Sequence, residues 1–451
     1  MDLIAGLGAL GVHLSESPSD RETHGEDLTY HPARAPDAVA YPETSAEVAA
    51  VLAFANARGV PVVPFGAGTS LEGHVIPVAG GISLDLSRLT RIEIHADDLS
   101  ATAQAGVTRS ALNRAAGEHG LQFPVDPGAD ATLGGMAATN ASGTTTVRYG
   151  GMRTQVLGLE VVLADGTVLH TGSRAFKSSA GYNLTGLFVG SEGTLGVITE
   201  LLLRLYGIPE YAIAARASFG DLDAAVRAAV AMIGSGVVLT RVELLDALTL
   251  GAVNRYKEAA YPEAPSLFLE FGGTETGVTG EVEAAREICA AEDCLSFEFE
   301  REAEARSRLW EARHHAALAL AATAPPGWKF KATDVCVPLS ELPGAIRHAR
   351  GLVEERGLEA SIIGHVGDGN YHVGFSVDPA DPAAIDAAEA VNHELVEYAL
   401  ARGGTCTGEH GIGLGKIDYL EAEHGDLIPA MQGIKRLLDP NGILNPGKVL
   451  R

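Results

Sequence analysis

Two short stretches near the C-terminus hold the residues best suited to chemistry in this 451-residue sequence. The first runs from Gly364 to His372 and reads Gly-His-Val-Gly-Asp-Gly-Asn-Tyr-His. Within it, Asp368-Gly369 is a dipeptide typical of a two-residue type I′ β-hairpin turn. Such a turn would place His365 and His372 opposite each other, with Cβ atoms roughly 4.5–5.5 Å apart. The second stretch is Gly408-Glu409-His410-Gly411.

Two imidazoles at that separation suit one divalent metal ion, and Glu409 and His410 would add a carboxylate ligand and a base. The alternative is a cross-strand histidine pair that only packs or faces water, which is the commoner origin of such a spacing taken by itself. The nearby Glu-His stretch is the observation that favours a metal site. On the residues alone, both interpretations stay open.

The composition excludes several classes of partner. Lys and Arg number 33 against 58 Asp and Glu, for a net charge of −25, which argues against nucleic acid or anionic lipid as the main partner. The four cysteines form no CxxC pattern, so a reducing compartment fits. The start lacks a basic region, and no apolar run is long enough to span a bilayer. We expect a cytoplasmic protein without a transmembrane segment.

The order of expected elements predicts an α+β fold with two domains. Residues 1–30 are polar and are expected to form an irregular leading arm, followed by a first domain over residues 31–206. There a capping box at Thr44 to Glu47 opens a helix, strands are expected at 60–65 and 81–86, and 156–168 form a hairpin.

The pattern breaks at residues 206–210, and a second domain is expected over 207–404. It combines a strand at 266–271 with several long helices, which predicts an antiparallel sheet with helices on one face. Residues 405–451 are expected to return to the first domain and contain a helix at 428–438. The helices expected in the second domain span residues 222–232, 282–291, 303–322 and 380–402.

Three glycine-rich segments lie in the first domain, at residues 64–73, 124–143 and 190–199. Glycine lets a backbone approach a ligand closely, and successive N–H groups with hydroxyls can cradle a phosphate. None of the segments is a Walker loop or a G-x-G-x-x-G fingerprint. Tight turns or close strand packing would explain each one separately, but three together favour a large phosphorylated cofactor.

With the ending Asn445-Pro446-Gly447-Lys448, these segments and the two histidine stretches resemble one family in order and spacing. It is that of FAD-dependent D-2-hydroxyacid dehydrogenases, in the vanillyl-alcohol oxidase / p-cresol methylhydroxylase superfamily. The segment Thr333 to Pro338 looks most like cytochrome-type D-lactate dehydrogenases; glycolate oxidase flavin subunits and D-2-hydroxyglutarate dehydrogenases are close relatives. The resemblance implies a p-cresol methylhydroxylase-type FAD-binding domain of two α/β subdomains, and an α+β cap domain with an antiparallel sheet.

The resemblance also implies the site. FAD would be bound non-covalently, a divalent zinc or manganese ion would be held by His365, His372 and Glu409, and His410 would be the catalytic base. Arg313 would clamp the substrate carboxylate, with Lys329 or Lys331 as the second candidate for that role; a solvated helix face is the alternative for Arg313. The residues expected to line the cofactor are Pro64, Gly66, Ala67, Gly68, Thr69, Ser70, Gly73, Asp126, Pro127, Gly128, Thr132, Gly134, Gly135, Thr139, Asn140, Gly143, Glu192, Gly193, Gly196, Val197, Ile198 and Asn445.

The expected reaction is oxidation of a small D-2-hydroxyacid, D-lactate first, to the 2-oxoacid by metal-assisted deprotonation and hydride transfer to flavin N5. Glycolate or D-2-hydroxyglutarate oxidation is the alternative within the family; a metal-dependent hydrolase or a non-catalytic flavoprotein subunit is the alternative from another class. The sequence leaves open the electron acceptor (a quinone, a cytochrome or electron-transfer flavoprotein), peripheral membrane association through that acceptor, and whether the chain forms a homodimer.

Overall fold

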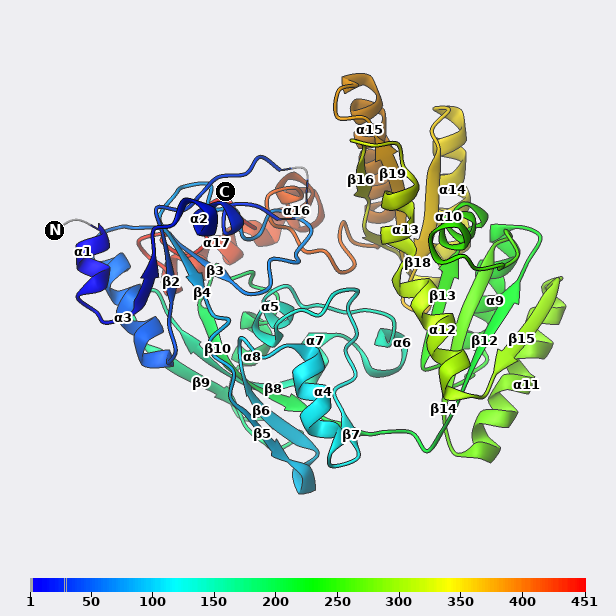
Figure 1. Cartoon of the computed structure of the whole chain (residues 1–451), viewed down its shortest axis with the longest axis horizontal. Coiled ribbons are helices and arrows are strands. Elements are labelled where there is room, and N and C mark those ends of the chain that lie inside the picture. The colour runs from blue at the N-terminus through cyan, green and yellow to red at the C-terminus, as the bar shows by residue number, and fades with distance from the viewer. Residues whose placement is uncertain (1–2, 28, 30) are drawn as a thin grey trace. The chain divides into compact units, whose positions relative to one another are not determined.

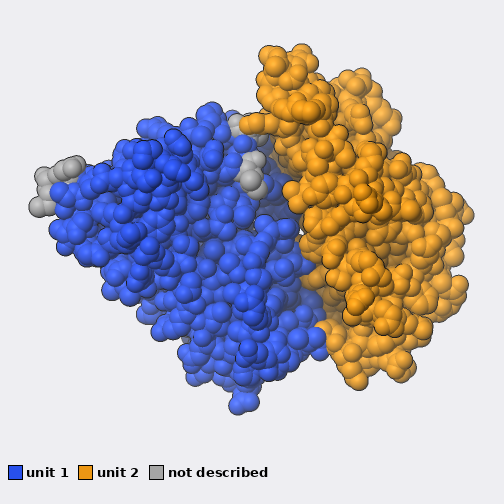
Figure 2. All heavy atoms as spheres, in the orientation of Figure 1, with its two compact units in different colours: residues 1–142, 149–208, 409–451 blue, residues 143–148, 209–408 orange. Residues whose placement is uncertain are grey.

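In the computed structural model, residues 3–27, 29 and 31–451 are described, and the chain divides into two compact units (Figure 2). Unit 1 comprises Met1–Ser142, Tyr149–Ile208 and Glu409–Arg451. Unit 2 comprises Gly143–Arg148 and Pro209–Gly408. The chain therefore leaves unit 1 near residue 208 and returns to it at Glu409.

Residues 3–23 of unit 1 contain regular elements, which corrects the expectation of an irregular arm over that stretch. They form helix α1 (Leu3–Gly8), strand β1 (His13–Ser15) and helix α2 (Pro18–Thr23) (Figure 1). β1 pairs antiparallel with β2 (Ala38–Tyr41), and Leu7 of α1 is fully buried. The polar composition hid this because few of these side chains are buried: α1 buries Gly6 and Leu7, and α2 buries none of its residues.

The α/β part of unit 1 is a four-stranded sheet in the order β1-β2-β4-β3. β2, β4 (Ile82–Asp85) and β3 (Val62–Phe65) are parallel, and helix α3 (Ser45–Asn56) connects β2 to β3. The predicted helix cap is present, since Oγ1 of Thr44 accepts a hydrogen bond of 3.2 Å from the Glu47 amide. The Glu47 carboxylate accepts in return from the amide of Glu43, one residue before Thr44, at 2.6 Å. β3 runs directly into the glycine-rich loop that begins at Gly66.

The second part of unit 1 is a five-stranded antiparallel sheet in the order β5-β6-β10-β8-β9. β8 and β9 form the predicted hairpin, with Val162 opposite Val168. Both sheets share one hydrophobic core, which joins residues such as Val62 and Ile82 to Val161 and Leu201. The strands are β5 (Ile92–His95), β6 (Ser100–Gln104), β8 (Val156–Val162), β9 (Val168–Gly172) and β10 (Val197–Arg204), with β7 (Leu121–Gln122) and β11 (Tyr206–Gly207) paired separately.

Short helices connect these strands, and the C-terminal segment completes unit 1. Leu444 forms a parallel bridge with Val62 of β3, and the amide of Asn445 donates to the Val62 carbonyl at 2.8 Å. The chain's last stretch thus extends the edge of the α/β sheet. The helices of unit 1 are α4 (Arg109–Gly117), α5 (Leu133–Ala138), α7 (Met152–Gln155), α8 (Leu184–Phe188), α16 (Ile417–His424) and α17 (Ile428–Leu438); α6 (Thr146–Tyr149) starts in unit 2.

Unit 2 contains an antiparallel sheet in the order β15-β12-β14-β13-β18-β19-β16, with β17 also paired to β19. Its strands are β12 (Tyr211–Ser218), β13 (Arg241–Leu245), β14 (Ser266–Gly273), β15 (Ser296–Glu300), β16 (Lys329–Ala332), β17 (Val335–Cys336), β18 (Ala360–Gly364) and β19 (Asn370–Val377). The predicted antiparallel sheet is therefore present.

Helices cover both faces of this sheet, not one as expected. Phe268 of β14 joins a core with Leu309 and Trp310, while its neighbours Leu267 and Leu269, which point to the opposite face, are also fully buried. Helices α10 (Ala247–Lys257), α12 (Ala303–His314) and α13 (Ala316–Thr323) form one layer. The other layer consists of α9 (Leu222–Gly234), α11 (Glu275–Ala291), α14 (Leu342–Glu355) and α15 (Pro382–Leu400) (Figure 1).

In the part of the chain that the structure describes, no helix combines the length and apolarity needed to cross a bilayer.

Candidate active site

The loop after β3 is the first candidate cofactor-binding element of unit 1. Gly68 has φ +65°, a conformation that favours glycine, and a Cβ atom at Gly66 would collide with Oγ1 of Thr132. Thr132 caps α5, where its hydroxyl accepts from the Gly135 amide. The first and second glycine-rich segments therefore touch through Gly66 and Thr132.

The third glycine-rich segment lies beside the first. A Cβ atom at Gly193 would lie 2.9 Å from Cγ of Pro64, the residue that leads into the loop. Gly196, by contrast, faces the sheet, since its Cβ would lie 2.5 Å from Cγ1 of Val161. Val197 and Ile198 are buried in the core of unit 1, so the side chains of these predicted cofactor residues serve packing.

Two hydroxyls in these segments fit a phosphorylated cofactor. Oγ of Ser70 and Oγ of Ser191 are buried and have no hydrogen-bond partner among the described residues. Buried hydroxyls are normally hydrogen-bonded. A pyrophosphate or ribityl oxygen of the cofactor would supply the partner that each of these serine hydroxyls lacks. The donors of this loop, with the small residues around them, therefore fit FAD.

Three further predicted cofactor residues are held by protein contacts. Asp126 forms an ion pair of 3.0 Å with Arg109, and the hydroxyl of Thr139 donates to the Gly135 carbonyl at 3.1 Å. Oδ1 of Asn140 accepts from the Arg153 amide at 3.0 Å. Gly143 belongs to unit 2, whereas the other predicted cofactor residues belong to unit 1.

The histidine hairpin of unit 2 forms, but in a register different from the prediction. His372 lies opposite Ile363, and β18 ends at Gly364, so His365 lies in the loop and not across from His372. The loop is longer than two residues, since β18 ends at Gly364 and β19 begins at Asn370. Within it the Asp368 amide donates to the His365 carbonyl at 2.9 Å, and Val366 is buried. The two imidazoles still meet, with ring centroids 5.8 Å apart and planes at 90°.

His365 is oriented by a buried carboxylate. Its Nδ1 lies 2.7 Å from Oε1 of Glu243, and Oε2 of Glu243 lies 2.6 Å from Nη2 of Arg313. Burial opposes the charge of Glu243, but His365 and Arg313 together hold the pKa of that carboxyl below its usual value. An ionised carboxylate only accepts, so Nδ1 of His365 carries a proton, and in the neutral ring the lone pair lies on Nε2.

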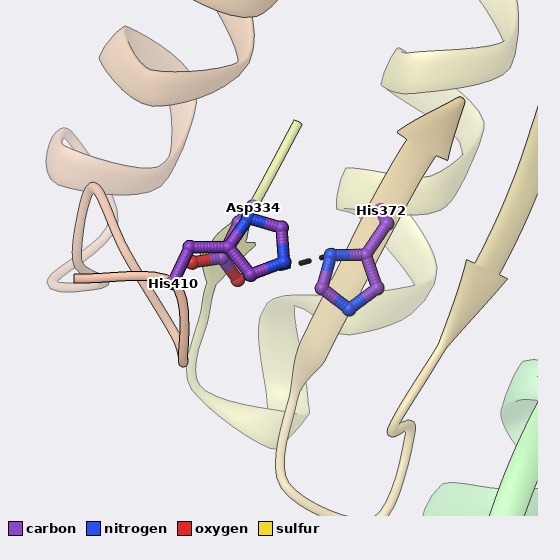
Figure 3. Close-up of side chains that lie close together, drawn as sticks. All are labelled: Asp334, His372 and His410. Atoms are coloured by element: carbon purple, nitrogen blue, oxygen red, sulfur yellow. Dashed lines mark ion pairs between the residues drawn. The ribbon is translucent and has the colours of Figure 1, made fainter. Parts of the chain in front are cut away.

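His372 is oriented in the same way by the backbone. Its Nδ1 lies 2.9 Å from the carbonyl oxygen of Thr333, which can only accept, so in the neutral ring the lone pair also lies on Nε2. Figure 3 shows the ring beside the fully buried Asp334, whose Oδ1 lies 3.8 Å from His372 Nδ1. Asp334 also accepts hydrogen bonds from Nδ2 of Asn370 at 2.8 Å and Oγ1 of Thr407 at 2.6 Å.

Both histidines of unit 2 donate Nδ1–H to a protein acceptor, and in the neutral ring each keeps its lone pair on Nε2. Histidines that bind metal ions are usually oriented by such a contact. The donor set therefore fits a divalent ion such as zinc. Glu409 and His410, the other predicted members of this site, follow directly after Gly408, the last residue of unit 2. Gly408 packs tightly against the side-chain amide of Asn370.

The three predicted substrate-binding cations differ in their surroundings. Arg313 lies on α12 with both Nε and Nη2 directed to Oε2 of Glu243. Lys331 of β16 forms an ion pair with Glu389 of α15, and Lys329 is exposed. Arg313 is connected through Glu243 to His365, a candidate metal ligand.

The sequence reasoning missed Glu243, Asp334 and Asn370 as site residues. Glu243 is a charged residue inside the apolar strand Arg241–Leu245 and is 1% exposed, which is rare for glutamate unless it is paired. A glutamate between Val242 and Leu244 was the signal that pointed to a buried partner.

Comparison with known proteins places this geometry in a family. Residues 208–449 match the family described as FAD linked oxidases, C-terminal domain, and residues 36–172 match the FAD binding domain. The chain is 47% identical over 438 residues to "Probable D-lactate dehydrogenase, mitochondrial" of Danio rerio, covering 95% of this chain and 87% of the relative. It is 42% identical over 442 residues to "D-lactate dehydrogenase [cytochrome], mitochondrial" of Arabidopsis thaliana, covering 97% and 78%.

A bacterial relative covers the chain equally well. The "Glycolate oxidase subunit GlcD" of Bacillus subtilis is 35% identical over 443 residues, covering 97% of this chain and 94% of the relative. Among solved structures, 4-ethylphenol oxidase from Gulosibacter chungangensis superposes with a TM-score of 0.78 at 19% identity, covering 99% of this chain and 96% of that one. This likeness confirms the predicted fold class. The chain therefore belongs to the FAD-linked oxidase family, as its motifs predicted, and is an FAD-linked oxidoreductase.

Proposed function

We propose that this chain oxidises a small D-2-hydroxyacid, D-lactate first, to the corresponding 2-oxoacid. The observation that carries the proposal is the matched pair of His365 and His372, each with Nδ1 committed to a protein acceptor, in a chain 47% identical to a relative named D-lactate dehydrogenase. A hydrolase, the alternative from another class, does not fit a member of the FAD-linked oxidases.

The metal ligands in this proposal are His365, His372 and Glu409, with zinc or manganese as the ion. Two imidazole nitrogens and one carboxylate oxygen leave positions open for substrate oxygens, as catalytic sites of these ions do. Glu409 directly follows Gly408, so the Cα atoms of these two residues lie about 3.8 Å apart. Gly408 itself packs against the side chain of Asn370. When bound, the ion acts as a Lewis acid on the substrate's hydroxyl and carboxylate oxygens.

His410 is the proposed base. Oxidation of a hydroxyacid requires removal of the hydroxyl proton, and an imidazole is the side chain whose ordinary pKa lies closest to neutrality. Arg313 is the proposed partner of the substrate carboxylate, since its planar guanidinium still has Nη1 donors beyond the edge directed to Glu243. Lys331 is the less favoured cation because Glu389 already neutralises it.

FAD is proposed to bind non-covalently, with its pyrophosphate on the loop from Gly66 to Ser70. When bound, it accepts the hydride from the substrate's Cα at N5. Acid precipitation of the purified protein tests the attachment: the yellow colour should remain in the supernatant as FAD. Colour that stays in the protein pellet would refute non-covalent binding, and recovered FMN would refute the cofactor.

The electron acceptor is proposed to be a cytochrome, since the Arabidopsis relative carries that word in its name. Quinone and electron-transfer flavoprotein are the alternatives. Cytochrome c reduction in the presence of D-lactate tests this step, with a soluble quinone analogue and electron-transfer flavoprotein as parallel assays.

The substrate assignment is tested by anaerobic flavin bleaching with D- and L-lactate, glycolate and D-2-hydroxyglutarate. D-lactate should reduce the flavin fastest and L-lactate should not reduce it. Glycolate is the second candidate, because the Bacillus relative is named as a glycolate oxidase subunit. Reduction by L-isomers alone, or by alcohols without a carboxylate, would refute the assignment.

A further inference from the structure

We propose that Glu192, paired with His74, is a positioning residue that fixes the backbone directly after His410. The carboxylate of Glu192 is 6% exposed and accepts two backbone hydrogen bonds. Oε1 accepts from the amide of Ile412 at 2.7 Å, and Oε2 accepts from the amide of Gly413 at 2.8 Å. All of these residues lie in unit 1, so the arrangement is internal to one compact body.

His74 supplies the opposite charge. Its Nε2 lies 3.0 Å from Oε2 of Glu192, and the histidine is 5% exposed. At this distance the opposite charges of the two side chains attract each other directly. Although burial opposes both charges, each residue favours the charged form of the other: the pKa of His74 is raised and that of Glu192 is lowered.

Gly411, the residue that follows His410, packs onto this ion pair. It has φ +85°, and a Cβ atom there would lie 2.7 Å from Oε1 of Glu192 and 2.8 Å from Nε2 of His74. No larger residue fits without displacing one of the two. Residues 411–413 thus wrap around the carboxylate, with glycine contact on one side and two amide donors on the other.

The ion pair is itself held rigidly. Nδ2 of Asn445 donates to the carbonyl of Glu192 at 2.8 Å and to the carbonyl of His74 at 3.2 Å. The amide of Glu192 donates to the Ala138 carbonyl at 2.8 Å. Burying a carboxylate costs free energy unless the carboxylate is paired and hydrogen-bonded. The partners of Glu192 are mainly backbone groups, so its role is to hold the backbone in place.

The consequence for the reaction rests on the proposed function. His410 is covalently adjacent to Gly411, so a shift of residues 411–413 moves the proposed base. Misplacement of a catalytic group by about 1 Å can cost on the order of 10²-fold in rate. The side chain of Glu192 therefore acts through the backbone next to His410, a role beyond the cofactor contact that the family resemblance implied.

The test compares Glu192→Gln with Asp85→Asn in the FAD-loaded protein. Asp85 is a matched control, because it also forms a buried pair with a histidine of unit 1, His24, at 2.8 Å. Glu192→Gln should lower kcat by about 10–100-fold with KM changed less than about threefold and FAD content unchanged. Asp85→Asn should keep kcat within about twofold.

A second pair of variants removes dependence on one substitution. Gly411→Ala should reproduce the kcat loss, whereas Gly442→Ala should not. Gly442 has φ +65° in the same C-terminal segment, but a Cβ atom there meets nothing within 4 Å, so it controls for backbone strain.

Hydrogen exchange supplies a readout that does not need activity. The peptide containing Ile412 and Gly413 should exchange faster in Glu192→Gln than in wild type, and Asp85→Asn should leave it unchanged. If no hydroxyacid reduces the flavin of the wild-type protein, the proposed function is refuted. The hydrogen-exchange comparison would still decide whether Glu192 positions residues 411–413. Unchanged exchange, a kcat equal to wild type, or loss of FAD from Glu192→Gln would overturn the proposal.

Discussion

Oε1 of Glu243 lies 2.7 Å from Nδ1 of His365, and both side chains are buried in unit 2. This carboxylate–histidine contact fixes the tautomer that leaves the lone pair on Nε2 and turns the ring toward His372. A carboxylate in that position also raises the basicity of the histidine as a ligand. Glu243 is therefore expected to control the affinity for the proposed metal ion without being one of its ligands.

Glu243→Gln should lower metal affinity by about 10–100-fold, because the neutral amide no longer fixes the Nδ1–H tautomer of His365. Metal titration followed by elemental analysis measures the loss. Asp246→Asn is the control: Asp246 is an equally buried carboxylate that pairs with Arg350 at 2.9 Å just beyond the same strand. Equal metal affinity in the two variants would rule out this role for Glu243.

Gly66→Ala should weaken FAD binding by about tenfold or more, since the new Cβ collides with Oγ1 of Thr132 and displaces either the loop or the helix cap. The FAD-to-protein ratio after dilution and gel filtration is the measurement. Gly117→Ala, at the exposed end of α4 with open space around its Cβ, should keep full occupancy. Full occupancy in both variants would remove the Gly66 loop from the cofactor site.

Local sequence signals predicted much of this fold. The helix cap at Thr44, the hairpin from Val156 and the helix Ile428–Leu438 depend on neighbouring residues, and all appear as expected. The single predicted helix over 303–322 is interrupted at His315, between α12 and α13. No glycine or proline lies within residues 303–322, so no helix-breaking residue marked that interruption.

The site was harder to predict because its geometry depends on distant residues. The turn dipeptide Asp368-Gly369 suggested a two-residue loop, but Gly369 packs against the Val337 carbonyl and the loop begins at His365. The partner of His365 is Glu243, which is 122 residues away in sequence. Periodicity and spacing carry no information on a contact of that range.

The pair His24–Asp85 should make stability depend on pH. Although burial of His24 opposes its charge, the hydrogen bond to Asp85 and the nearby charges raise the pKa of His24 above its ordinary 6.5. The stabilisation is therefore fully present below about pH 6.5 and is lost as the pH rises through the higher folded-state pKa.

The difference in Tm between wild type and Asp85→Asn should accordingly be larger at about pH 6 than at about pH 9. His24→Gln, which cannot be charged, should abolish that pH dependence. A Tm difference that is constant across this range, or that grows with pH, would show that the pair contributes no proton-linked stability.

His372→Ala should remove both metal and activity while FAD stays bound, because the glycine-rich loops belong to unit 1 and His372 to unit 2. The variant loses one of two imidazole ligands, and metal affinity should fall below the range in which the ion survives dialysis. Elemental analysis and the flavin absorption spectrum measure the two quantities separately. Loss of flavin together with metal would contradict the assignment of separate binding residues.

Single-turnover flavin reduction by D-lactate in His410→Ala tests the central claim most directly. The protein should keep both FAD and metal, yet its flavin should be reduced about 10²–10⁴-fold more slowly than that of wild type, the usual contribution of a general base. Stopped-flow absorbance under anaerobic conditions gives this rate without interference from the electron acceptor. A His410→Ala protein that is reduced at the wild-type rate, or a metal-free wild type that is fully active, would contradict the mechanism.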